Sequence, residues 1–111
     1  MRLADTLFTM NKIPKKNKVY IVNKSGHVYD AASAFGDLVF VTEGTIDRYD
    51  ANGMWRIWHD ALDGSAPEDY LLLTSLNVLC AIGAAVFAKM HGRLNLLLYS
   101  NGKYIPRELV L

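Results

Sequence analysis

The sequence has a single cysteine, Cys80, among its 111 residues, so no disulfide can form within the chain. This excludes the disulfide-stapled class of small secreted domains and fits a reducing compartment. Cys80 stands in an apolar run, where a thiol is typically a small buried hydrophobe rather than a nucleophile. We therefore expect the fold to depend on a hydrophobic core, which a chain of this length can build as one domain.

Long hydrophobic runs are also missing. The most apolar stretch, residues 71–88, is interrupted by Thr74, Ser75, Asn77 and Gly83, whereas a membrane-spanning helix needs about 20 consecutive apolar residues. The N-terminus carries charges in place of a continuous apolar segment, so the sequence predicts no secretory signal. We expect a cytoplasmic protein, in the host cytoplasm if it is viral, with no membrane contact.

Several short motifs with known chemistry are absent. No GxGxxG follows the first predicted strand, and neither GxxxxGK[ST] nor GxSxG occurs. The three histidines stand far apart and there is no CxxC, so the spacing typical of metal ligands is missing. The sequence predicts no metal and no cofactor.

Positive charge is concentrated at one end of the chain. Residues 1–24 hold six basic residues against Asp5, a net charge of +5, while residues 25–111 carry −4. We divide the chain into a basic leader, residues 1–18, and one domain, residues 19–111. A lysine-rich leader can bind nucleic acid by neutralising phosphates. No aromatic residue lies within the lysine cluster, so we favour a solvated leader.

The remaining sequence alternates between strand-like and helix-like segments. The strand-like segments are short, nearly continuous apolar runs, which are typical of parallel strands covered on both faces. They are residues 19–22, 38–41, 70–73 and 94–99. A fifth strand, residues 103–105, follows the Asn101-Gly102 hairpin signal, and Pro106 suits either an edge strand or the end of one.

Helical patterns fill the three gaps between the first four strands. The first covers residues 29–35, and the second is expected to begin after an N-cap at Thr45 and to end at Asp63-Gly64. The third, residues 76–90, is apolar nearly all round and should be buried on more than one side. The order predicts an α/β fold: a small three-layer, mostly parallel, Rossmann-like or flavodoxin-like sheet with an antiparallel C-terminal edge hairpin.

Polar residues gather where the parallel strands end. Ligands of such sheets bind beyond the carboxyl ends of the strands, so these residues are the candidate ligand-binding site. They are Ser25, Gly26, His27, Thr42, Glu43, Gly44, Thr74, Ser75 and Asn77. Free N–H groups at the start of the third helix could hold a small anionic ligand. The alternative is that strand–helix turns and caps require these residue types anyway.

His27 and Glu43 are the candidate catalytic pair. A carboxylate can orient and charge an imidazole for acid–base chemistry if the two loops adjoin. The alternative is two surface side chains with no mutual contact.

Four segments of the chain resemble small proteins encoded by bacteriophages. They are the residues around Val19–His27, Phe35–Val39 and Thr42–Gly44, and the ending Met90–Tyr99. The resemblance covers most of residues 19–107. It implies a protein made in a bacterial cytoplasm that acts on host machinery or on a small metabolite, and it assigns no catalytic residue.

We therefore favour a non-enzymatic binding protein, with a phage accessory role, that engages a host protein or a nucleotide-like ligand at the carboxyl edge of the sheet. One alternative is a small enzyme that acts on a phosphorylated or nucleotide substrate through His27 and Glu43. The other is a nucleic-acid binder that works through the leader. We also expect a homo-oligomer, because these apolar side chains exceed what so small a core needs: Leu3, Leu7, Phe8, Trp55 and Trp58.

Overall fold

The computed structural model describes residues 17–111. Its elements alternate between strands and helices along the chain. The strands are β1 (Lys18–Ile21), β2 (Asp37–Phe40), β3 (Tyr70–Leu72), β4 (Arg93–Ser100) and β5 (Lys103–Val110). The helices are the 3-10 helix η1 (Asp30–Phe35) and the α-helices α2 (Ala51–Ala61) and α3 (Asn77–His91). The predicted leader lies outside the described residues, apart from Asn17 and Lys18.

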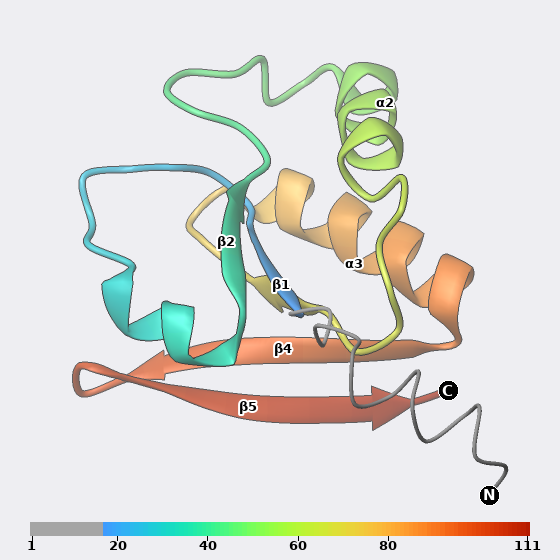
Figure 1. Ribbon diagram of the computed structural model, residues 1–111. Coiled ribbons are helices and arrows are strands. Elements are labelled where there is room, and N and C mark those ends of the chain that lie inside the picture. The colour runs from blue at the N-terminus through green and yellow to red at the C-terminus, as the bar shows by residue number, and fades with distance from the viewer. Residues whose placement is uncertain (1–16) are drawn as a thin grey trace, which may run out of the picture.

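The five strands form one sheet in the order β2-β1-β3-β4-β5 (Figure 1). Strands β2, β1, β3 and β4 run parallel to one another, and β5 pairs with β4 in the antiparallel direction. This confirms the predicted mostly parallel α/β fold and its C-terminal edge hairpin. The first four strands follow the order of flavodoxin-like sheets, while the antiparallel β5 departs from it, so a Rossmann-like or flavodoxin-like relationship stays a prediction.

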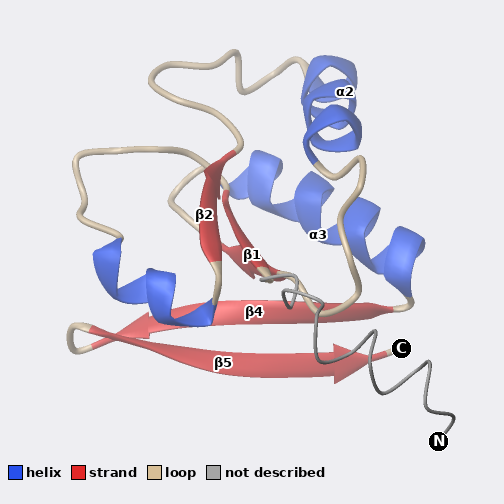
Figure 2. Cartoon of the chain, in the orientation of Figure 1, coloured by secondary structure: helices blue, strands red, loops and turns tan. Residues whose placement is uncertain are grey.

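Strand β1 is buried on both faces, and each face packs into a separate hydrophobic core. Val19 and Ile21 pack with the residues around η1, while Tyr20 and Val22 pack under α2 and α3. Figure 2 shows the two α-helices on one side of the sheet and η1 on the other, next to the turn end of the hairpin. The short η1 covers much less of the sheet than two α-helices do.

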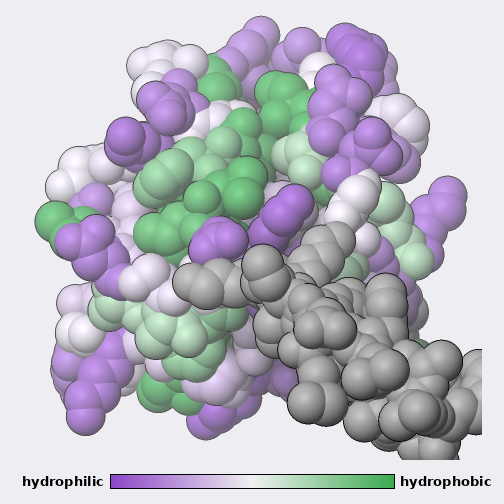
Figure 3. All heavy atoms as spheres, viewed as in Figure 1, coloured by the Kyte–Doolittle hydropathy of each residue, from purple (hydrophilic) through white to green (hydrophobic). Residues whose placement is uncertain are grey.

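The edge strand β2 is only half-buried. Leu38, Val39 and Phe40 all keep part of their surface exposed, and Figure 3 shows an apolar area that runs over β2 toward α2. The four-residue length of β2 limits the backbone it offers to another strand.

Helix α2 begins later than the sequence predicts. The expected N-cap at Thr45 is wrong, because Asp50 precedes the first helical turn and its carboxylate accepts a 2.9 Å hydrogen bond from the Gly53 N–H. Tyr49 fits the i, i+3 spacing of apolar residues that favours an earlier start of the helix, but its side chain is 90% exposed. Residues 45–50 are therefore a loop that leads into the helix.

Helix α3 packs against both α2 and β4, as its apolar sequence predicts. It is not buried all round, because Val78, Ala81 and Ala85 lie on an exposed outer face. It ends at Gly92, which adopts a left-handed conformation and donates its N–H to the Ala88 carbonyl oxygen. No helix among residues 17–111 is long and apolar enough to cross a membrane.

Trp58 belongs to the core. It is fully buried between α2 and α3, and its indole N–H donates a 2.8 Å hydrogen bond to the Leu79 carbonyl oxygen. Trp58 therefore cannot contribute to a surface for self-association, and that part of the argument for a homo-oligomer was wrong. Trp55 keeps 51% of its surface exposed, so homo-oligomerisation stays a prediction that light scattering at high protein concentration would test.

Candidate functional site

A pocket of about 440 Å³ lies at the carboxyl ends of β1 and β3, and we call it the edge pocket. The connections after β1 and β3 leave in opposite directions, to β2 and to β4, which is where open α/β sheets bind ligands. Three residues that line the edge pocket, Tyr29, Leu72 and Tyr104, belong to or pack against the core on the η1 side of the sheet. The lining residues of the pocket are Ser25, His27, Val28, Tyr29, Leu72, Leu73, Thr74, Ser75, Tyr99 and Tyr104.

The loop after β1 forms one wall of the edge pocket. Tyr29 anchors this loop, since its ring is buried and its hydroxyl lies 2.8 Å from the Ser25 hydroxyl oxygen. The His27 ring packs edge-on against Tyr29, with 6.4 Å between ring centres. Gly26 stands between Ser25 and His27 in the chain, with open space where a Cβ would be, and is not itself a lining residue. Three predicted residues, Ser25, Gly26 and His27, thus lie together on this loop.

Thr74 and Ser75 continue from β3 along the floor of the edge pocket. The Thr74 hydroxyl oxygen is buried, and it is the one buried side-chain polar atom among residues 17–111 without a hydrogen-bond partner. Buried polar groups nearly always have a partner. Thr74 is also one of the residues that line the edge pocket.

The C-terminal hairpin supplies the opposite wall. Tyr99 and Tyr104 face each other across β4 and β5, and their rings pack edge-to-face at 5.4 Å. Sequence reasoning missed both residues because it took the candidate site only from the residues that follow the parallel strands. A usable signal was present: the Asn101-Gly102 turn fixes the register and places the two tyrosines opposite each other.

The walls of the edge pocket carry aromatic rings and hydroxyl groups, and none of its lining residues is Asp, Glu, Lys or Arg. Burial raises the pKa of the Tyr104 hydroxyl above its ordinary value, and the neighbouring Tyr29 and Tyr99 raise it further. Tyr104 therefore stays uncharged at neutral pH and can donate a hydrogen bond.

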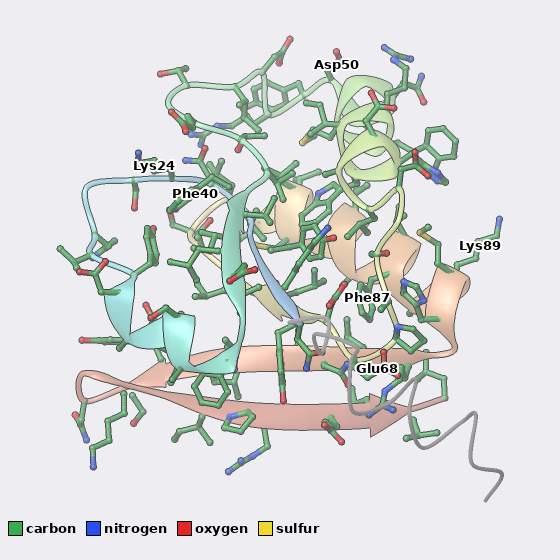
Figure 4. All side chains as sticks on the ribbon, in the orientation of Figure 1. Lys24, Phe40, Asp50, Glu68, Phe87 and Lys89 are labelled. Atoms are coloured by element: carbon green, nitrogen blue, oxygen red, sulfur yellow. The ribbon has the colours of Figure 1, made fainter. Side chains whose placement is uncertain are left out.

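The predicted residues after β2 lie outside the edge pocket. The Thr42 hydroxyl donates to the Val22 carbonyl oxygen at 2.9 Å, which ties the ends of β1 and β2 together. Glu43 and Gly44 follow it in an exposed loop. The Lys24 ammonium lies 5.1 Å above the centre of the Phe40 ring (Figure 4). The hydrogen bond of Thr42 supports the alternative that this residue is required by the turn rather than by a ligand.

The structure separates the two candidate catalytic residues. His27 lines the edge pocket, whereas Glu43 does not. In the part of the chain that the structure describes, no hydrogen bond is formed between their side chains. An acid–base pair would require the two loops to move toward each other.

Asn77 lines a second cavity, on the α2 side of the loop that joins β3 to α3. Ser75 borders both cavities, and Arg48 supplies the second cavity with a positive charge. Leu76 occupies the N-cap of α3, and no side chain caps the helix. Across residues 17–111, no group of three or more His, Cys, Asp or Glu side chains is placed to hold a metal ion.

The free energy of unfolding should fall as the solution becomes alkaline. Burial raises the pKa of Tyr20, Cys80 and Tyr104 in the folded chain, with Asp69 adding to the effect on Tyr20. The unfolded chain then loses these protons first, so stability is full below the ordinary pKa values of about 9 to 10 and declines above them. Urea unfolding at pH 7 and pH 10.5 measures the loss, which Tyr104→Phe should reduce. Equal unfolding free energies at the two pH values would contradict this prediction.

The comparisons with known proteins identify a family but no activity. The family model described as Phage Pam3 gp32-like protein matches residues 11–111. Neither a curated protein nor a solved structure matches the chain. The match confirms the resemblance to small phage-encoded proteins, and its length covers nearly the whole sequence. The chain therefore belongs to the Phage Pam3 gp32-like protein family.

Proposed function

We propose that this protein is a non-enzymatic phage accessory protein that binds a small ligand in the edge pocket, in the cytoplasm of an infected bacterium. The observation that carries the proposal is the hydroxyl of Thr74, which is buried and has no hydrogen-bond partner. Thr74 lines the edge pocket, which lies where the chain connections after β1 and β3 diverge. A ligand that hydrogen-bonds this oxygen would remove the cost of leaving it unsatisfied, about 1–3 kcal/mol.

Binding is favoured over catalysis by the groups that line the pocket. His27 supplies the one imidazole of the lining, and no carboxylate lines the pocket to orient or charge it. The lining groups instead suit recognition, since apolar walls with a few hydroxyl groups are typical of ligand pockets.

A titration that follows the backbone amide resonances tests the proposal. Nucleosides, nucleotides and other small metabolites are added to the full chain, and each compound is afterwards checked for chemical change by mass spectrometry. We expect shifts at residues 25–29, 72–75 and 99–104 and recovery of the unchanged compound. Shifts confined to the leader would favour nucleic-acid binding. Turnover that His27→Ala abolishes would favour the enzyme, and no shifts at all would favour a host-protein partner.

A further inference from the structure

The lining of the edge pocket contains no Asp, Glu, Lys or Arg side chain. A phosphate or carboxylate buried there would lose its hydration and meet no Lys or Arg side chain in return. Arg48 lines the second cavity, which shares Ser75 with the edge pocket. The part of a ligand that enters the edge pocket should therefore be neutral.

Aromatic side chains stand on two sides of the edge pocket. His27 and Tyr29 come from the loop after β1, and Tyr99 and Tyr104 come from the hairpin. Tyr99 is 68% exposed, so its ring is available for contact. Flat rings stack on such side chains, and stacking of one nucleobase on an aromatic residue is worth about 1–3 kcal/mol.

The polar groups of the pocket are hydroxyls, which both donate and accept hydrogen bonds. Ser25 comes from the loop after β1, Thr74 and Ser75 follow β3, and Thr74 still lacks a partner. A nucleobase edge presents donors and acceptors side by side, which hydroxyl groups of this kind can match. A free sugar carries a hydroxyl on most of its carbons and would need more polar partners than this lining provides.

We infer that the ligand of the edge pocket is a neutral nucleobase carried as a nucleoside, with the base between the aromatic walls and the sugar at the mouth. The inference rests on the proposed function and narrows it, since a nucleotide gains nothing from its phosphate at this site.

Calorimetric titration of the full chain tests the inference with adenosine, guanosine, cytidine and uridine, each beside its 5′-monophosphate. At least one nucleoside should bind, and its monophosphate should bind no more than about threefold more tightly. A monophosphate that binds tenfold or more tightly, with the gain lost in Arg48→Ala, would overturn the inference and place the phosphate in the second cavity.

Two pairs of variants locate the contact. Tyr99→Leu should weaken nucleoside binding about tenfold or more, whereas Tyr49→Leu, at an exposed tyrosine outside the pocket, should leave it unchanged. Thr74→Val should weaken binding about tenfold, with Thr45→Val as its control. Equal effects in a variant and its control would overturn the inference.

The outcomes also separate this inference from the proposed function. If no nucleoside binds but another metabolite shifts the amides of the edge pocket, the nucleoside inference is wrong and the proposed function stands. If none of the compounds shifts those amides, both are wrong.

Discussion

Replacing Gly83 with alanine is expected to lower the free energy of unfolding by about 3 kcal/mol. A Cβ built at Gly83 would overlap the six-membered ring of Trp58. Trp58 is fully buried and hydrogen-bonded to Leu79, so its ring has no room to move aside. The higher helix propensity of alanine, about 1 kcal/mol, offsets only part of the loss.

Gly26→Ala is the matched control for this variant. No atom lies within 4 Å of a Cβ at Gly26, so its unfolding free energy should change by a few tenths of a kcal/mol at most. Urea unfolding of the two variants beside the unaltered protein gives the comparison. A Gly83→Ala protein as stable as the control would show that α2 and α3 do not pack through Trp58.

Replacing Asp69 with alanine should cost about 3 kcal/mol, because two backbone donors then lose a charged acceptor. Asp69 is only 3% exposed, and its carboxylate accepts 2.8 Å hydrogen bonds from the N–H groups of Lys18 and Ala66. These bonds fasten the start of β1 to the turn before β3. Asp69 therefore positions the two central strands from the end opposite the edge pocket.

Asp63→Ala provides the control, since Asp63 is an exposed acid just after α2. It removes the same charge from the same region and should change the unfolding free energy by less than about 0.5 kcal/mol. Thermal unfolding monitored by circular dichroism is sufficient to separate the two variants. Equal losses would mean that net charge, rather than the two hydrogen bonds, determines the effect.

The strands could be predicted because their residues leave few alternatives. A run such as 19–22 has apolar side chains on both faces, and only a strand between two cores buries them all. The hairpin followed from Asn101-Gly102. Its full length did not, because Pro106 is compatible both with an edge strand and with the end of one, and the strand continues to Val110. Pro106 faces Leu97 at a position where the ladder alternation points its nitrogen away from β4, so no ladder hydrogen bond is lost.

The start of α2 and the role of Trp58 could not be predicted from spacing alone. Apolar residues at positions 46 and 49 extend the helical pattern backward, while the Asp50 cap sets the true start. Whether a tryptophan covers the core or an interface depends on its partners. For Trp58 the partner is Gly83, 25 residues away, whose missing side chain makes the space.

The candidate site could be predicted in part from the geometry of parallel strands. Residues that follow β1 and β3 meet because those strands are neighbours, and neighbouring parallel strands end at one edge. The loop after β2 lies farther along that edge and does not reach the pocket. The tyrosines of the hairpin enter the site only through the pairing of β4 with β3, which is a tertiary contact.

A crystal structure of the protein grown with a saturating nucleoside would test the central claim most directly. We expect a base between the rings of His27 and Tyr99, with one of its polar atoms within hydrogen-bond distance of the Thr74 hydroxyl. A nucleoside found instead in the second cavity beside Asn77, or an edge pocket that stays empty while the nucleoside is bound elsewhere, would contradict it.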